Sequence, residues 1–253
     1  MPPLVYETVA WLRFYSCLPI PPLPGEPEAD AAPDLARTAH AVPIAGALIG
    51  AIGGLVLILA WAMRLPAFLA AALALATLVI VTCARAEQAL TASAEQIGKS
   101  QTGGAVMSYG VIALVLAVLM RVGALEGLTA LGAFKAALAL VGAGAVSRAA
   151  AVSFSLTQPV SQSEGAAVAV QRLDVAALQR LSIVALVVGA VAILPAYGVG
   201  STVVGIGAAI GAAAAVTALS RFAGDTTREL AVAAEQAAEI AFLVAVLVFA
   251  HGP

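Results

Sequence analysis

Charge is the property in which this chain is poorest. Only 10% of its 253 residues are Asp, Glu, Lys or Arg, whereas an ordinary soluble domain carries about a quarter. Hydrophobic residues make up 62% of the chain, and the mean hydropathy is +1.04. So few charged side chains cannot cover the surface of a globular domain in water. The composition therefore indicates an integral membrane protein.

The chain also has little excess of either charge and few cysteines or histidines. Each of these shortages excludes a class of function. The formal net charge is −2, so no basic field indicates a nucleic acid or another polyanion as partner. The two cysteines, Cys17 and Cys83, lie in unrelated contexts, which predicts neither a disulfide framework nor a zinc site. The two histidines, His40 and His251, lie at the ends of segments. We expect neither to bind a metal or to act as a general base.

Long apolar windows are what the chain has in abundance. A membrane-spanning helix needs about 20 apolar residues. Windows of about that length occur at residues 42–63, 67–84, 104–120, 124–147, 181–197, 199–219 and 229–250. We therefore predict an all-α, polytopic membrane bundle of about seven transmembrane helices, with tight turns at residues 64–66 and 121–123. The region 149–180 stays ambiguous, because its apolar opening is too short to span.

The first 40 residues differ from the rest. The stretch "LVYETVAWLRFYSCLPIP" is amphipathic, with aromatic side chains suited to the headgroup region of a bilayer. Charged residues and prolines interrupt it early, so we do not expect a cleavable signal. The following "PPLPGEPEADAAPD" is rich in proline and acid and reads as extended. We predict an interfacial helix and a linker over residues 1–40, followed by the transmembrane bundle over 41–253.

The cations are distributed unevenly about the predicted spans. With a cytoplasmic N-terminus, nine of the twelve Lys and Arg residues fall on the cytoplasmic side: Arg13, Arg37, Arg85, Lys99, Arg148, Arg172, Arg180, Arg221 and Arg228. Arg64 and Arg121 would then face outward, and Lys135 would lie within a span. The positive-inside rule favours this orientation in a bacterial-type inner (cytoplasmic) membrane. It places the polar segments 85–103, 157–180 and 220–228 together on the cytoplasmic face.

Small residues recur at a spacing of four. Gly46, Gly50 and Gly54 form one such series, and Gly207 and Gly211 form another. Small residues at this spacing let two helix backbones approach closely. The partner is either a neighbouring helix of the same chain or a second copy in a homo-oligomer.

Ionisable residues in or beside apolar windows are candidates for function, because inserting one costs at least ~2.5 kcal/mol. The candidates are Glu87, Glu95, Lys135, Glu229, Glu235 and Glu239. Glu235 and Glu239 are four residues apart on one helical face, beside Gln236. Such a carboxylate stripe either holds Mg²⁺, which prefers oxygen ligands, or pairs with Arg221, Arg228 or Lys135 and stabilises the bundle. We expect Lys135 to neutralise a buried carboxylate.

Five segments, in their order along the chain, carry a family resemblance. They are "LRFYSCLPIPPLPGE", "ARTAHAVPIAGALIGAIGGLVLIL", "YGVIALVLAVLMRVGAL", "SRAAAV" and "AAEQAAEIAFLV". Together they resemble the cobalamin synthase family, the adenosylcobinamide-GDP ribazoletransferases. The resemblance implies a polytopic, Mg²⁺-dependent membrane enzyme that joins activated cobinamide to α-ribazole or its phosphate and releases GMP. Such a reaction is an in-line displacement at phosphorus.

The chain departs from the family pattern at its acidic run. Family members carry a run resembling His-x-Asp-Gly-x-x-Asp-x-x-Asp-Gly after the second span. Aligned with it, Ala86 stands at the His, and Gln88, Ala92 and Glu95 stand at the three Asp positions. One acid therefore remains in the run, with Glu87 adjacent. We expect weak or absent synthase activity, and partial recovery when Gln88→Asp and Ala92→Asp are made together.

Two further elements also differ. The family's Lys-Asp-Ser-Arg is replaced at residues 102–105, and a Thr-Gly-Asp-like element reads Thr227-Arg228-Glu229. The resemblance implies the following roles: Glu87, Glu95, Glu229 and Thr227 in catalysis, the same three acids as Mg²⁺ ligands, and Arg37, Arg148 and Gln236 in substrate binding.

Two classes of function follow from this pattern. One is a membrane-embedded ribazoletransferase of nucleotide-loop assembly, with the corrinoid substrate, α-ribazole and the lipid bilayer as partners. The other is a catalytically silent paralogue that binds a corrinoid intermediate or scaffolds the enzymes of the pathway. A transporter is a weaker alternative, because the two halves of the chain show no convincing repeat of spans.

Overall fold

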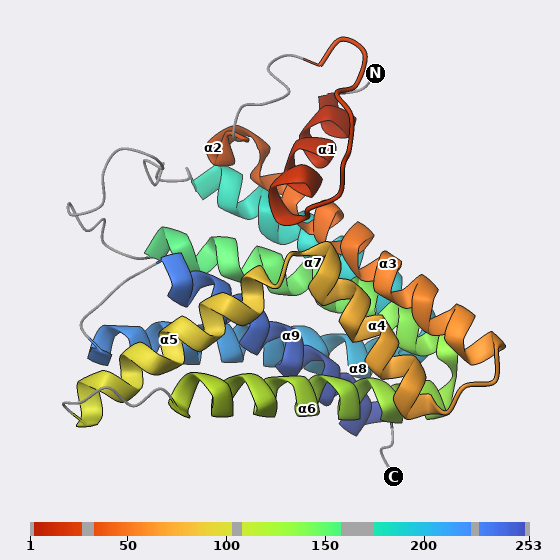
Figure 1. Ribbon diagram of the computed structural model, residues 1–253. Coiled ribbons are helices and arrows are strands. Elements are labelled where there is room, and N and C mark those ends of the chain that lie inside the picture. Colours follow the sequence, from red (N-terminus) through yellow and green to blue (C-terminus); the bar gives the residue numbers. More distant parts are fainter. Residues whose placement is uncertain (1–2, 27–32, 103–107, 158–174, 224–227, 251–253) are drawn as a thin grey trace.

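A computed structural model of the chain describes residues 3–26, 33–102, 108–157, 175–223 and 228–250. Within these ranges every regular element is helical, which confirms the predicted all-α bundle (Figure 1). The elements are α1 (Pro3–Tyr15), α2 (Leu35–Thr38), the 3₁₀ turn η1 (Ala39–Ala41), α3 (Val42–Ala62), α4 (Ala67–Val81), α5 (Arg85–Thr102), α6 (Ser108–Leu131), α7 (Ala133–Thr157), α8 (Val175–Ala223) and α9 (Arg228–Ala250). Most of the ambiguous region 149–180 lies outside the described residues.

Within the described residues, five stretches are long and apolar enough to cross a membrane: those containing α3, α6, α7, α8 and α9. The count rises to six if α4 and α5, which meet at an 86° bend, form one broken span. The chain is thus a multi-pass membrane protein. The predicted number of about seven is higher, because it treated α4 as a span by itself and divided α8 in two.

Helix α8 has a break that explains its length. Its apolar stretch of 42 residues would extend about 63 Å if straight, roughly twice the hydrocarbon thickness of a bilayer. At Gly198 the backbone takes φ 80° and ψ −179°, a conformation that glycine adopts without steric cost. Gly198 divides α8 into two arms, which correspond to the two windows read from the sequence.

The predicted turn at residues 121–123 is wrong. Helix α6 continues through it to Leu131, and the chain turns instead at Gly132, where φ is 144°. Arg121 does not face outward but is buried, with 4% of its surface exposed. The turn after α3 is confirmed, with Arg64 exposed at φ 62°.

The glycine series of α3 packs within the chain. A Cβ at Gly46 would lie 2.1 Å from the carbonyl oxygen of Gly144, and one at Gly50 would lie 2.3 Å from that of Leu140. Only glycine permits this approach of α3 to α7, so the first series serves packing inside the bundle. Gly207 and Gly211 are exposed on α8, and their use in an oligomer stays a prediction.

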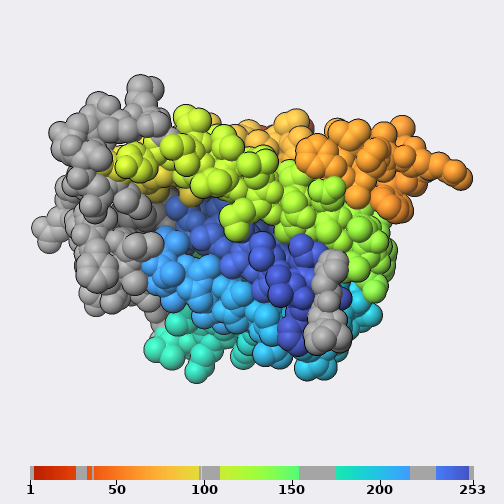
Figure 2. Space-filling view, turned by 90° about the horizontal axis from the view of Figure 1, so that it is seen from below, coloured from red at the N-terminus to blue at the C-terminus, as the bar shows by residue number. Residues whose placement is uncertain are grey.

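The apolar surface of the bundle suits a lipid environment. In Figure 2, α9 lies between α6 and α8 on the face that is shown, and these helices are in contact. Large side chains on α6 and α8 are exposed, among them Val111, Ile112, Leu119, Val203 and Ile210.

Helix α1 is fastened to one end of the bundle (Figure 1). The indole Nε1 of Trp11 donates to Oγ1 of Thr38 at 2.9 Å. Cys17 and Cys83 are joined by a disulfide, with Cα atoms 6.0 Å apart. The sequence predicted no such pair, because 66 residues separate the two cysteines and no local pattern shows that α1 returns to the end of α4. The assignment of residues 1–40 to a separate part stays a prediction.

Candidate functional site

A sharp bend between α4 and α5 begins the candidate site. The two helices meet at 86°, and the linking residues Cys83 and Ala84 have φ values of 54° and 53°. Residues with a side chain rarely adopt positive φ, and such strain concentrates at functional sites. Cys17 N–H donates to the carbonyl oxygen of Val81 at 2.8 Å, and the Arg85 guanidinium donates to the carbonyl oxygen of Phe14. The end of α1 and the residues just after it therefore brace the bend.

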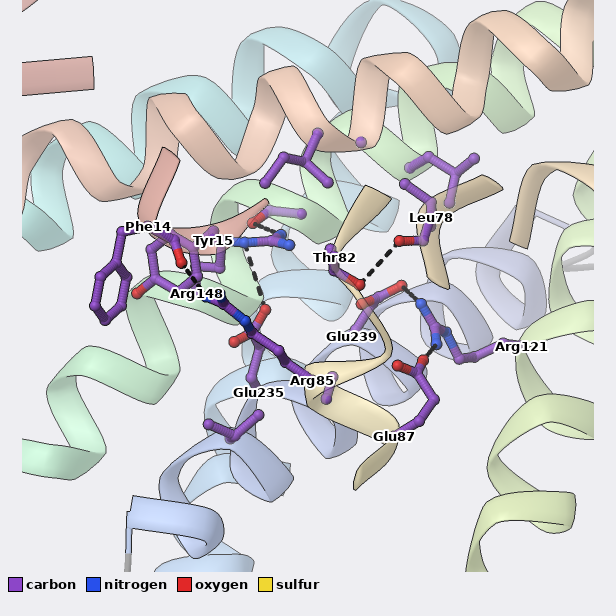
Figure 3. A pocket seen from close by; sticks show the side chains of 16 residues that line it. Phe14, Tyr15, Leu78, Thr82, Arg85, Glu87, Arg121, Arg148, Glu235 and Glu239 are labelled. Carbon is purple, nitrogen blue, oxygen red and sulfur yellow. Dashed lines mark hydrogen bonds and ion pairs between the residues drawn. The ribbon is translucent and has the colours of Figure 1, made fainter. Parts of the chain in front are cut away.

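One buried arginine connects the carboxylates of two helices. Arg121 of α6 donates from Nη1 to Glu87 of α5 at 2.9 Å and from Nη2 to Glu239 of α9 at 2.7 Å (Figure 3). The amide Nε2 of Gln236, also on α9, donates to Glu87 Oε1 at 3.2 Å. Removing one partner of such a buried pair costs about 3–5 kcal/mol, because a charge is left uncompensated. The three helices are thus joined at one polar point.

A second buried arginine lies opposite this cluster. Arg148 of α7 has its Nε 3.4 Å from Glu235 Oε1 and donates from Nη1 to the carbonyl oxygen of Gly144 at 3.1 Å. Its guanidinium carbon lies 5.4 Å from the centre of the Tyr15 ring, within cation–π range. Tyr15 belongs to α1, so the N-terminal helix contributes to the site (Figure 3).

These side chains surround a cavity of about 90 Å³. Its lining includes three arginines (Arg85, Arg121 and Arg148) and three glutamates (Glu87, Glu235 and Glu239), beside aromatic and apolar residues. The formal charges of the six cancel. A cavity of this size holds several waters or a group of similar bulk, such as a phosphoryl group. The interior of a membrane bundle therefore contains a polar chamber with no net formal charge.

Four buried atoms here lack a hydrogen-bond partner in the described part of the chain, three on side chains that line this chamber and one on Gln236, which contacts Glu87. They are Glu87 Oε2, Gln236 Oε1, Arg121 Nε and Arg148 Nε. Buried polar atoms are almost always paired, and each exception calls for an explanation. The 3.4 Å contact of Arg148 Nε with Glu235 is an ion pair but is too long for a hydrogen bond.

The structure brings together three of the predicted site residues and separates two. Glu87 and Arg148 line the chamber, and Gln236 donates to Glu87. Glu95 lies eight residues beyond Glu87 on α5, about 12 Å along the axis, and a Cβ at Gly110 of α6 would touch its Cγ at 2.9 Å. Arg37 is exposed on α2 and does not line the cavity.

The remaining predictions concern the start of α9. Thr227 lies outside the described residues, and Glu229 is in α9 but its side chain is not described. Among the described side chains, no three His, Cys, Asp or Glu residues come together to hold a metal ion. Of the predicted Mg²⁺ ligands, Glu87 and Glu95 therefore lie apart on α5. The role of Glu229 as a ligand stays a prediction.

Sequence reasoning missed Arg121 and assigned the wrong partners to the stripe on α9. Glu239 pairs with Arg121 and Glu235 with Arg148, rather than with the cations expected from the sequence. Lys135 is exposed beside the Tyr197 ring, 5.9 Å from its centre, and does not neutralise a buried carboxylate. The missed signal is a single arginine inside an apolar window, which is costly unless it is paired.

The structure places Glu87, rather than Gln88, on the buried face of α5. Glu87 is buried and faces Arg121, whereas Gln88 is exposed. The three acids of the run are spaced by four and then three residues, which places them on one helical face. If Glu87 stands at the first acidic position of the run, the other two positions fall at Thr91 and Ala94. Each lies one residue earlier than in the alignment with the family pattern.

Comparisons with known proteins agree on one family. A family model described as cobalamin-5-phosphate synthase matches residues 7–247. A relative from Azorhizobium caulinodans, named adenosylcobinamide-GDP ribazoletransferase, is 41% identical over 98% of this chain and 97% of its own length. A relative of the same name from Xanthobacter autotrophicus is 42% identical over 97% of this chain and 97% of its own length. Another, from Rhizobium etli, is 32% identical over 94% of this chain and 95% of its own length. No solved structure gives a significant match.

Proposed function

Because the chain belongs to the cobalamin-5-phosphate synthase family, we propose that it acts as an adenosylcobinamide-GDP ribazoletransferase with the polar chamber as its reaction centre. The reaction joins activated cobinamide to α-ribazole or its phosphate and releases GMP. Relatives named for this transfer match nearly the full length of the chain at 41% and 42% identity. This likeness favours the transferase over a silent paralogue.

The observation that carries the assignment is the convergence of charged side chains inside an apolar bundle. Residues from α5, α6, α7 and α9 supply three arginines and three glutamates to one cavity. Charges at such a position are expensive and mark functional sites in membrane proteins. The strained bend at Cys83 and Ala84 adjoins Glu87, which supports the same location.

The chemistry requires positioning more than covalent help. An oxygen of α-ribazole attacks the phosphorus that carries cobinamide, a new P–O bond forms, and the P–O bond to GMP breaks. Negative charge accumulates on the phosphoryl oxygens and on departing GMP. Guanidinium groups held in a preorganised chamber inside an apolar bundle stabilise such charge effectively.

Mg²⁺ is the cofactor that the family resemblance implies, and the donor set fits an ion that arrives with the substrate. Glu87 Oε2 and Gln236 Oε1 are buried oxygens without a hydrogen-bond partner in the described residues. Mg²⁺ is commonly held by one or two carboxylates together with substrate phosphates and water. Glu87, which lines the chamber, would hold it, and the ion would supply charge neutralisation at the phosphoryl oxygens.

We also propose a bacterial-type inner membrane location with a cytoplasmic N-terminus. With Arg121 buried in the bundle, Arg64 is the remaining cation predicted to face outward, so the charge asymmetry becomes stronger. A membrane-impermeant maleimide should label Arg64→Cys in intact cells and leave Arg37→Cys unlabelled, in a background with both native cysteines replaced by serine. The reverse pattern would reject this orientation.

The function is tested by GMP release. Purified protein in liposomes receives adenosylcobinamide-GDP, α-ribazole and Mg²⁺, and chromatography measures GMP and the joined product. We expect turnover by the wild type and a loss of about 10²-fold or more in Glu239→Gln. The matched control is Glu126→Gln, which changes an exposed glutamate of α6 and should leave turnover unchanged. A folded wild-type protein that releases no GMP would favour the silent paralogue.

A further inference from the structure

The polar chamber is exposed on one side. Most of the charged side chains that line it are buried, whereas Arg85, the first residue of α5, is exposed. Phe14 and Tyr15, the last two residues of α1, line the same cavity and are half-buried (Figure 3). The end of α1 and the start of α5 therefore border the side of the cavity that faces out, which we call the mouth.

The disulfide joins the two borders of this mouth. Cys17 follows Tyr15 by two residues, and Cys83 precedes Arg85 by two. The bond holds the two cysteine Cα atoms 6.0 Å apart. The Arg85 guanidinium also donates to the carbonyl oxygen of Phe14, but a hydrogen bond at an exposed residue is readily exchanged for one to water. The covalent bond is thus the contact that fixes the width of the mouth.

Both cysteines are within reach of a small thiol, because both are exposed. Exposed disulfides are the labile ones in exchange with thiols. The proposed orientation places the N-terminus, and with it Cys17, in the cytoplasm, where glutathione keeps most thiols reduced and disulfides are as a rule transient. The pair therefore has two accessible forms, the disulfide that the structure shows and two free thiols.

The substrates of the proposed transfer are too large for the chamber itself. The cavity of about 90 Å³ has room for several waters, but not for a nucleoside or a macrocycle. These parts of the substrates must lie in the mouth while the phosphorus reacts in the chamber. The two borders of the mouth then have to separate, which the disulfide prevents and a pair of thiols permits.

We infer that Cys17 and Cys83 form a thiol–disulfide switch at the mouth of the chamber, open as thiols and closed as the disulfide, with glutathione as its reaction partner. A glutathione thiolate attacks one sulfur to give a mixed disulfide, and a second glutathione releases the protein thiol. Two glutathione thiols supply two electrons and two protons and leave as glutathione disulfide; oxidation of the pair is the reverse reaction. The inference rests on the proposed function, because it assigns the open form to substrate entry.

The first test compares turnover by one protein in two redox states. The purified full chain in liposomes is oxidised with glutathione disulfide or reduced with dithiothreitol, freed of reagent, and given adenosylcobinamide-GDP, α-ribazole and Mg²⁺. Mass spectrometry verifies the internal disulfide and the absence of bound glutathione. We expect GMP release about tenfold or more slower in the disulfide form, with full recovery in dithiothreitol. Equal rates in the two forms would overturn the inference.

The matched control is the double variant Cys17→Ser with Cys83→Ser, which cannot form the bond. It should turn over at the rate of the reduced wild type after either treatment. A double variant that slows after oxidation as the wild type does would assign the effect to another group and overturn the inference.

Hydrogen exchange measures the mouth without substrate. The Cys17 amide donates to the carbonyl oxygen of Val81, so its exchange reports separation of the two borders. We expect peptides over residues 14–17 to exchange about tenfold or more faster in the thiol form, while peptides of α3 stay unchanged; identical exchange in both forms would overturn the inference. Redox-dependent exchange without GMP release in either form would refute the proposed function alone. GMP release at equal rates in both forms would refute the inference alone.

Discussion

At the residue scale, the site depends on one arginine whose importance the sequence conceals. Glu87, Arg148 and Gln236 could be singled out because polar side chains are conspicuous among Ala, Leu and Val. Arg121 was taken for a turn, because a cation that interrupts an apolar window usually marks the membrane surface. Its partners lie 34 and 118 residues away in sequence. A pairing over such separations leaves no local pattern, so only the fold reveals it.

The first prediction concerns this arginine. Arg121→Met keeps much of the side-chain volume but leaves Glu87 and Glu239 buried without their shared partner. We expect a loss of about 3–5 kcal/mol in stability, measured as denaturant-induced unfolding in detergent. The control Arg64→Met removes an exposed cation and should change stability little.

A triple variant shows whether the loss comes from charge. Adding Glu87→Gln and Glu239→Gln to Arg121→Met removes the two orphaned carboxylates and should restore most of the stability. An Arg121→Met protein as stable as the wild type would show that the bridge contributes nothing to the fold.

At the element scale, apolar windows predicted most helices because burial in lipid requires long uninterrupted apolar runs. The windows for α3 and α9 agree with the observed helices to within a residue or so. They failed at α5, whose mean composition is polar, and at the boundary of α6 with α7. Helix α5 lies at 86° to α4, and its polar face is matched by Arg121 and Gln236. Such a helix carries no hydropathy signal.

The second prediction tests which face of α5 carries the acidic run. Thr91 and Ala94 share a helical face with Glu87, and the Thr91 hydroxyl donates to the Glu87 carbonyl oxygen at 2.8 Å. We expect Thr91→Asp with Ala94→Asp to raise the affinity for Mg²⁺ in calorimetric titration. Gln88→Asp with Ala92→Asp, the pair that the sequence alignment suggested, is the matched control and should change it little, because Gln88 points to the exterior. Tighter Mg²⁺ binding by the control pair alone would restore the alignment register.

At the scale of the whole molecule, the bundle combines an apolar exterior with a polar chamber at the meeting point of α1, α5, α6, α7 and α9. Composition alone predicted the exterior, and the family resemblance predicted the chemistry. Neither could locate the chamber, because its walls come from segments that span more than 200 positions of the chain, from Phe14 to Glu239. The fold separates Glu95 from this chamber, although the acidic run had suggested that Glu87 and Glu95 act together.

The central claim is that catalysis takes place at this chamber, and GMP release by two matched variants tests it most directly. Glu87→Gln and Glu95→Gln are the same substitution on the same helix, but only Glu87 lines the cavity. With Mg²⁺, adenosylcobinamide-GDP and α-ribazole, we predict that Glu87→Gln loses about 10²–10³ in turnover, while Glu95→Gln stays close to the wild type. Full turnover by Glu87→Gln together with loss of turnover in Glu95→Gln would contradict the account and move the reaction centre along α5.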